Sequence, residues 1–390
     1  MHALSPIRSM LAVSWLTMHL ACASSASTCD NFFGQRCRID LSTGIHMSYF
    51  DSGPAAGDPV IMLHTDTTSA LEWAWTVDAL RRLDPDLHVY ALDQRGAGDT
   101  DLPNTQACWS TPNLCITRAD LAADILAFMD AKHIAKASLV GHAMGAGAAR
   151  RLALDHPERV TRLILSGTAA PAAQPPAPRP WSDGMDALGW RKMLEAKGVR
   201  WPEGALHMRP LDIDPDAVRH LTQSWDISVI AAPDVVKAIA AQSAAESLAS
   251  WGRLDRTVPP EQAPERLERL SIPTLVLWGS EDSGLDRGSQ TRLIAELNEA
   301  SRNHAGMYFY WKQYGVRAPP SSGDKHDADD IGHNLSWEAP GQLAADIDHF
   351  IRTGAPTQDR YRTDAPNHLR TILVEPGKAT IITSRRGATP

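Results

Sequence analysis

The chain has 390 residues, of which 43% are hydrophobic and 22% are charged, and its formal net charge is −8. This length suits one large α/β domain with an insertion or two modest domains, and the composition is that of a globular protein with a buried core. Acidic and basic residues are interspersed without a lysine or arginine cluster. This pattern argues against nucleic acid or an anionic membrane surface as the partner.

Residues 1–26 have the pattern of an export signal: a short segment with one arginine, an apolar stretch from Met10 to Ala23, and small residues at suitable cleavage points. The apolar stretch is short and is interrupted by Thr17 and His19, so no membrane span is expected. We therefore predict a secreted or periplasmic protein. A lipoprotein attached through Cys22 is a weaker alternative, because His19 stands where a lipidation motif has an aliphatic residue.

Removal of the signal leaves four cysteines in two close pairs, Cys29 with Cys37 and Cys108 with Cys115. In an oxidising compartment this spacing predicts two local disulfides. Four unpaired buried thiols are the alternative. A zinc site is disfavoured because no histidine has finger-like spacing to the cysteines.

Strand and helix patterns alternate along the mature chain. A leading β-hairpin is expected over Cys37–Ser42 and Ile45–Phe50. Thr117 and Asp120 form a capping-box pattern at the start of one helix. The alternation predicts an α/β fold with a doubly wound, mostly parallel sheet. The segments are strands at Pro59–His64, His88–Leu92, Ala137–Val140 and Arg162–Leu165, and helices at Ala70–Leu83, Thr117–His133 and Met144–His156.

A long insertion interrupts this alternation. A proline-rich linker at 169–180 precedes helical, tryptophan-bearing sequence that extends to about Leu267. The sheet is expected to resume at Pro273–Gly279 and Met307–Gln313, before a last helix at Pro340–Arg352. The predicted division is a signal peptide at 1–26, the first part of the core at 27–170, a helical cap at 171–267, the second part of the core at 268–352 and a C-terminal extension at 353–390.

The segment Gly141-His142-Ala143-Met144-Gly145 has the spacing of a nucleophile elbow, with alanine in place of the nucleophile. In the pattern G-x-S-x-G a serine occupies a strained turn between a buried strand and a helix, and the small residues let those elements approach closely. Alanine has no hydroxyl, so the chain as it stands should lack serine-hydrolase chemistry.

Over about residues 37–352 the chain resembles the α/β-hydrolase family. The resemblance is carried, in the family's order, by Leu63-His64, the segment Asp93–Thr100, the elbow, Trp278–Asp282 and Gly332-His333-Asn334.

The resemblance implies a catalytic triad at Ala143 as the nucleophile position, Asp282 as the acid and His333 as the base. In such a triad the acid orients the histidine that deprotonates the nucleophile. Glu281 is the rival of Asp282 for the acid role.

A tetrahedral intermediate also needs backbone N–H donors for its oxyanion. By resemblance, Met144 supplies one donor and either Thr65 or Asp66 supplies the second. The family usually has glycine and an apolar or aromatic residue where this chain has Thr65-Asp66. The Asp66 carboxylate is therefore expected either to turn away or to bind a cationic or hydroxyl-bearing part of the substrate.

The remaining site candidates concern substrate binding. His142 is a candidate for substrate contact, although a packing or hydrogen-bonding role is the more common one for such a residue. The cap tryptophans, Trp181 and Trp225 above all, are candidates to line a pocket, and the others are expected in the core of the cap. No cofactor is expected. The acidic run 324–330 is interpreted as a solvated loop rather than a metal site.

Three explanations of Ala143 remain open: an inactivated form of a serine hydrolase, which we favour, a natural pseudoenzyme that binds a ligand, or chemistry without this nucleophile. The predicted activity is hydrolysis of a small carboxylic ester or lactone by Ser-His-Asp chemistry. An aminopeptidase or other amide hydrolase of the same fold is the alternative, and a non-catalytic binding protein is the alternative of another class. The oligomeric state stays open.

Overall fold

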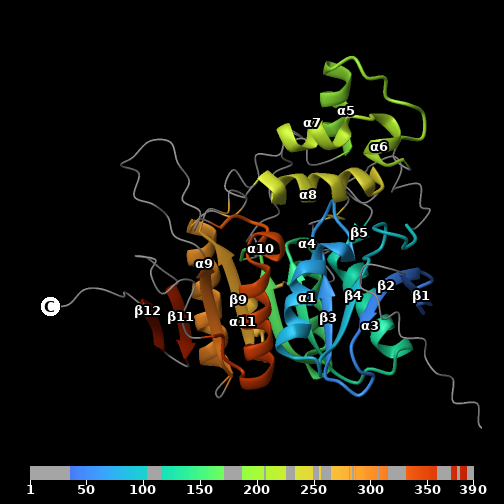
Figure 1. Cartoon of the computed structure of the whole chain (residues 1–390). Helices are drawn as coiled ribbons and strands as arrows, with labels where there is room; N and C mark the ends of the chain where they lie inside the picture. The colour runs from blue at the N-terminus through green and yellow to red at the C-terminus, as the bar shows by residue number, and fades with distance from the viewer. Residues whose placement is uncertain are drawn as a thin grey trace, which may run out of the picture.

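The protein is described here by a computed structural model (Figure 1). It describes residues 36–102, 116–170, 187–205, 208–224, 233–248, 254–255, 265–280, 282, 285, 287–304, 307–314, 331–357, 370–375 and 378–383. The predicted signal peptide lies outside these residues. None of the helices in the described ranges is both long and apolar enough to span a bilayer.

One large sheet forms the centre of the fold. Within the described residues it has ten strands in the order β1-β2-β4-β3-β6-β7-β9-β10-β11-β12. The pairs from β4 to β10 are parallel, whereas β1 and β2 at one edge and β11 and β12 at the other pair antiparallel. The strands are β1 Cys37–Asp40, β2 His46–Ser52, β3 Pro59–Leu63, β4 His88–Leu92, β6 Ala137–His142, β7 Val160–Ser166, β9 Thr274–Gly279, β10 Phe309–Tyr314, β11 Arg370–Glu375 and β12 Lys378–Thr383.

Helices cover both faces of this sheet, as the sequence predicts. Successive side chains of a strand point to opposite faces, so Val60 and Met62 pack with α1 and α11, while Ile61 and Leu63 pack with α3, α4 and α9. Buried apolar residues on both faces explain why the central strands read as continuous apolar runs. The helices are α1 Ala74–Leu83, α3 Arg118–Ala131, α4 Met144–Asp155, α9 Arg287–Asn303 and α11 Pro340–Thr353, with short helices η1 Ala70–Trp73, η2 Pro157–Arg159, η5 Leu267–Arg269 and α10 Leu335–Glu338.

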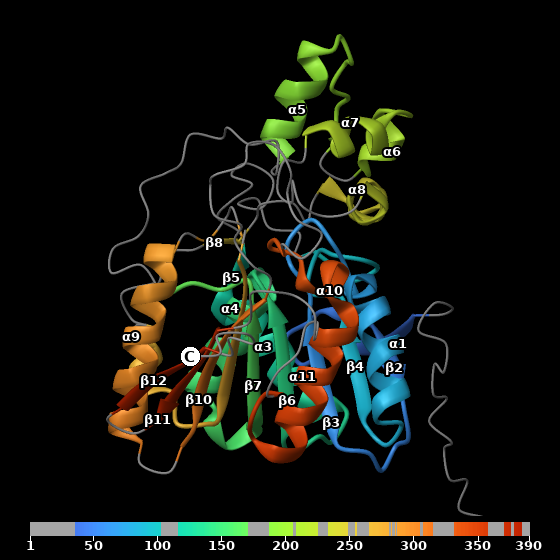
Figure 2. The same cartoon turned by 60° about the vertical axis from the view of Figure 1, so that its left-hand side comes forward.

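Among the described residues, four α-helices between β7 and β9 stand apart from the sheet, and Figures 1 and 2 show them stacked above one end of it. They have their own apolar core, which includes Leu194, Leu221 and Ala240 and is completed by Trp337 from α10. Trp201 packs against this core. The helices are α5 Ala187–Ala196, α6 Pro210–Ile213, α7 Ala217–Ser224 and α8 Pro233–Ala245, and a two-stranded sheet of β5 Ile116–Thr117 and β8 Leu254–Asp255 lies between them and the core.

The two ends of the described chain form hairpins. β1 and β2 form the hairpin that the sequence predicts, with Cys37 paired to Tyr49 and Asp40 to His46. β11 and β12 form a second hairpin that extends the sheet beyond β10. Cys37, the first residue of β1, is disulfide-bonded. Cys29, Cys108 and Cys115 lie outside the described residues, so both predicted pairings stay predictions.

Candidate active site

The elbow joins β6 to α4 and has the strained backbone that a nucleophile position requires. Ala143 has φ 46° and ψ −102°, in the region where residues other than glycine are uncommon. Its N–H donates to the carbonyl of Ser166 at 3.0 Å, which holds the turn against the end of β7. This strained backbone conformation is present although the alanine side chain has no functional group.

Close approach of the backbones explains the small residue at the far end of the elbow. A Cβ on Gly145 would lie 2.2 Å from the carbonyl oxygen of Leu63 in β3. The Gly145 N–H donates to the carbonyl of His64 at 3.1 Å across this contact. The glycine spacing read from the sequence is thus a packing requirement between α4 and the end of β3.

His333 and Asp282 come together over the elbow end of the sheet. His333 Nδ1 lies 2.8 Å from Asp282 Oδ2, and the Asp282 side chain is buried. Burial lowers the pKa of His333, but the neighbouring carboxylates of Asp282, Asp66 and Glu72 outweigh burial, so the pKa is raised above its ordinary value. The bond to Nδ1 leaves Nε2 as the nitrogen that a nucleophile at position 143 would use.

The loop that bears His333 is held from both sides. The Glu338 carboxylate accepts the N–H groups of Gly332 at 2.7 Å and Asn334 at 2.9 Å. At the end of β9, a Cβ on Gly279 would lie 1.9 Å from the carbonyl oxygen of Gly332. Glycine is therefore required where the strand carrying the acid meets the loop carrying the base.

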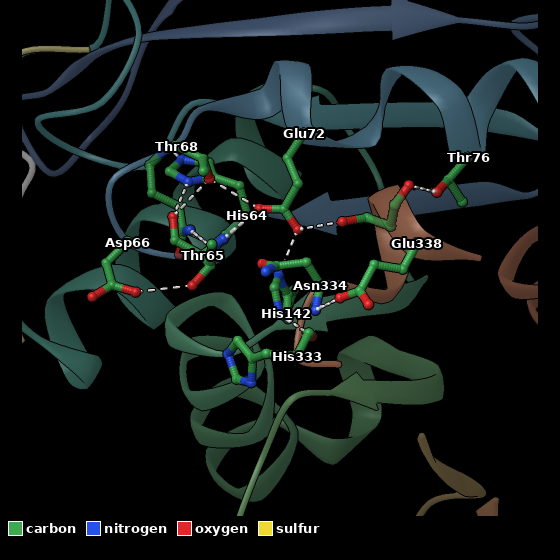
Figure 3. Close-up of polar contacts among 12 residues, drawn as sticks. His64, Thr65, Asp66, Thr68, Glu72, Thr76, His142, His333, Asn334 and Glu338 are labelled. Atoms are coloured by element: carbon green, nitrogen blue, oxygen red, sulfur yellow. Dashed lines mark hydrogen bonds and ion pairs between the residues drawn. The ribbon is translucent and has the colours of Figure 1, made fainter. Parts of the chain in front are cut away.

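A second buried histidine and carboxylate, His142 and Glu72, lie next to His333, and Figure 3 shows His142 between Glu72 and His333. His142 Nδ1 is 2.6 Å from Glu72 Oε1, and His142 Nε2 is 3.0 Å from the carbonyl oxygen of His333. Because His142 is only 1% exposed and both its ring nitrogens are occupied, the expected substrate contact by His142 is not supported. Its side chain instead supports the His333 loop.

The loop after β3 contains both candidates for the second oxyanion donor, Thr65 and Asp66. The Thr65 N–H donates to Glu72 Oε2 at 2.9 Å, so of the two alternatives for the second donor the Thr65 amide is already occupied. Among the described residues no acceptor is found for the N–H of Asp66. Met144 is the first residue of α4, so its N–H precedes the intrahelical hydrogen bonds.

The Asp66 side chain lies on the far side of Thr65 from Glu72 (Figure 3). Its Oδ1 accepts the Thr65 hydroxyl at 2.9 Å, and the residue is half-buried. Asp66 nevertheless contributes to the negative field that raises the pKa of His333. The carboxylate is thus turned toward its own loop but stays electrostatically coupled to the base.

The other predicted residues either have structural roles or lie outside the described ranges. In the Asp93–Thr100 segment, Asp93 accepts the Ala70 N–H at 2.8 Å and the Ser48 hydroxyl at 2.6 Å, which is a buttressing role. Glu281, Trp181 and Trp225 are not described. No set of three potential metal ligands occurs in the part of the chain that the structure describes.

Comparison with known proteins identifies the family. A family model for the alpha/beta hydrolase fold matches residues 58–308, well over half of the chain. The chain therefore belongs to the α/β-hydrolase family.

Individual relatives are distant. The chain is 26% identical over 290 residues to a 2-hydroxy-6-oxononadienedioate/2-hydroxy-6-oxononatrienedioate hydrolase of Burkholderia vietnamiensis, covering 71% of this chain and 88% of that protein. It is 33% identical over 153 residues to the 2-hydroxymuconate semialdehyde hydrolase of a Pseudomonas species, but this match spans only 38% of this chain and 47% of that protein. Among solved structures, a thermophilic esterase from Thermogutta terrifontis is similar, with a TM-score of 0.53, 21% identity, and coverage of 83% of this chain and 100% of that one.

Proposed function

We propose that this protein is a Ser-His-Asp hydrolase of small carboxylic esters or lactones in a form that lacks its nucleophile. The observation that carries the proposal is the hydrogen bond between His333 and Asp282, beside an elbow whose backbone strain persists at Ala143. An acid and a base kept in this geometry have no evident use without a nucleophile to deprotonate. The similarity to a family of hydrolases supports the same class of reaction.

With serine at position 143 the chemistry follows from the geometry. His333 Nε2 removes the hydroxyl proton while the serine oxygen attacks the carbonyl carbon, and Asp282 stabilises the imidazolium that forms. The carbonyl oxygen becomes an oxyanion, for which the N–H groups of Met144 and Asp66 are the proposed donors. His333 then gives its proton to the leaving alkoxide, and water releases the acyl group by the same steps in reverse order.

The alanine form is proposed to bind such substrates without turning them over, because the acid, the base and the oxyanion donors do not depend on the hydroxyl. Amide hydrolysis is the second candidate, and the half-buried Asp66 carboxylate beside the site favours it, since a carboxylate there suits a substrate amine. A ligand-binding pseudoenzyme would bind its ligand at the same site without catalysis.

Labelling with a fluorophosphonate probe separates these functions. The Ala143→Ser variant should react with the probe and the parent chain should not. Turnover of aryl esters, lactones and aminoacyl amides by the labelled variant then ranks the substrate classes. A variant that folds, binds ester analogues and neither labels nor turns over any of them would favour the pseudoenzyme.

The Asp66→Asn substitution should move the pH profile of the Ala143→Ser variant. His333 must be neutral to act as the base, so its raised pKa sets the acid limb of kcat/KM. Removing a negative charge near the imidazolium lowers that pKa, and the acid limb should move to lower pH. Measurement of kcat/KM between pH 5 and 9 on one ester tests this; an unchanged limb would show that Asp66 is not coupled to His333.

We further infer export to an oxidising compartment, supported by the signal pattern of residues 1–26 and the disulfide-bonded state of Cys37. Peptide mapping of the secreted protein without reduction should recover Cys29 linked to Cys37 and Cys108 linked to Cys115. Free thiols at these positions, or a mature N-terminus that still includes residues 1–26, would contradict export.

A further inference from the structure

We propose that Glu72 and His142 form a buried charged pair that positions the catalytic base, with His142 held as an imidazolium that donates a hydrogen bond to the backbone of His333. The inference rests on the proposed function for its catalytic consequence, but not for the charge state itself. Neither residue touches the reacting atoms in the proposed reaction. Both are positioning residues.

Glu72 links three segments of the active site. Its Oε2 accepts the Thr65 N–H and the Thr68 hydroxyl, each at 2.9 Å, from the oxyanion loop. Its Oε1 accepts the Ser336 hydroxyl at 3.1 Å from α10 and faces His142 Nδ1 at 2.6 Å in the elbow. The side chain is fully buried, so these four contacts replace all of its hydration.

The acceptors around His142 determine its protonation. A carboxylate that already accepts three hydrogen bonds is favoured in its ionised form. Although burial alone would raise the pKa of Glu72, His142 and the Thr65 N–H lower it below its ordinary value. An ionised carboxylate can only accept, so Nδ1 of His142 carries a proton. The carbonyl of His333 can also only accept, so Nε2 carries one as well. An imidazole ring with both nitrogens protonated is a cation.

His64, in the same loop system, shows the opposite arrangement. Its Nδ1 faces the Thr65 carbonyl at 2.6 Å, whereas its Nε2 accepts the N–H of Gln94 at 3.0 Å. One nitrogen donates and the other accepts, which is the neutral ring. The contrast shows that the charge on His142 follows from its particular partners rather than from burial in this region.

The charge has a direct consequence for the base. If His142 lost its Nε2 proton, a nitrogen lone pair would face the carbonyl oxygen of His333, and that loop would have to move. The rings of His142 and His333 are 4.8 Å apart between centroids, so the imidazolium that His333 becomes during attack forms beside a second cation. The Glu72 carboxylate offsets this repulsion. We therefore expect Glu72 to set both the position and the pKa of His333.

Charged and titratable groups near His333 come from every element around it. They are Asp282 after β9, Asp66 in the oxyanion loop, Glu72 in η1, His142 in β6 and Glu338 in α10. Asp66, Asp282 and Glu72 favour the charged form of His333. An imidazolium at His142, as proposed, opposes it. Neutralising Glu72 removes one negative charge that favours protonated His333, and it also allows His142 to lose a proton.

NMR of the ring nitrogens in the protein with Ala143 tests the charge state without any catalytic activity. Both ring nitrogens of His142 should carry a proton in the folded protein, because both face acceptors. Glu72→Gln should convert His142 to a ring with one proton and lower the pKa measured for His333 by titration. A neutral His142 in the parent protein overturns the proposal, and this measurement stands even if the Glu72 variant does not fold.

Asp346→Asn is the matched control, because Asp346 is another fully buried carboxylate, bonded to Lys312 and Thr357 between α11 and β10. It should lower stability and leave the His333 titration unchanged. In the Ala143→Ser variant, Glu72→Gln should lower kcat by about 10- to 100-fold, with a smaller change in KM, and move the acid limb to lower pH.

If Glu72→Gln and Asp346→Asn have equal effects on kcat and on the His333 titration, Glu72 has only a structural role. Absence of activity in the Ala143→Ser variant, together with a protonated His142 and a shifted His333 titration, would reject the proposed function and leave the pair established.

Discussion

Replacement of Ala143 by serine is expected to raise kcat/KM on an acyl substrate by a factor on the order of 10^5 to 10^6, the scale on which removal of a nucleophile silences a triad. The other parts are in place: His333 is bonded to Asp282, and the elbow already has the backbone conformation that exposes a side chain at position 143. Steady-state hydrolysis of an activated aryl ester by the purified variant and by the parent measures the gain.

Ala143→Gly is the control for this experiment. It relieves the positive φ of residue 143 without adding a hydroxyl, so it should match the parent in activity and be at least as stable. A serine variant that is folded but no more active than the glycine variant would show that the preserved His333–Asp282 pair does not serve a nucleophile at position 143.

The sequence predicted the core of the fold because each element depends on local signals. Continuous apolar runs mark strands buried on both faces, as at β3 and β4. The capping box at the start of α3 forms as predicted, with the Thr117 hydroxyl and the Asp120 carboxylate bonded to each other's backbone N–H. The glycines of the elbow have the spacing that close contact between α4 and β3 requires.

Features that depend on distant contacts were not predicted. Glu72 has no motif around it, and its importance arises only when Thr65, His142 and Ser336 converge on one carboxylate. The same convergence occupies the Thr65 amide, which family resemblance alone offers as an oxyanion donor. Sequence spacing describes one segment at a time, whereas a buried carboxylate is defined by its partners.

The helix α9 was missed for a different reason. It is a polar helix, and no element is predicted between Gly279 and Met307. Its buried residues Leu293, Leu297 and Ala300 nevertheless follow helical spacing. The spacing of its apolar residues, rather than its mean hydropathy, indicates this helix.

Substitution of the acid of the triad should also cause a large loss of activity once serine stands at position 143. In the Ala143→Ser variant, Asp282→Asn is expected to lower kcat by about 10^4-fold, because the amide NH2 can donate to Nδ1 and favour the wrong tautomer of His333, and because an uncharged amide does not stabilise the imidazolium. The Asp282 side chain is 1% exposed, so no water replaces the lost carboxylate. Stopped assays on the same aryl ester, with circular dichroism to verify folding, measure the loss.

Glu338→Gln in the same variant provides the comparison, since Glu338 holds the His333 loop through backbone N–H groups but makes no bond to the imidazole. Its glutamine keeps an acceptor for one of those two groups, so a much smaller loss is expected than for Asp282→Asn. If the two substitutions lower kcat equally, Asp282 acts only by holding the loop in place. If Asp282→Asn leaves kcat unchanged, the acid role belongs to another carboxylate, and Glu281 is the neighbour in sequence to substitute next.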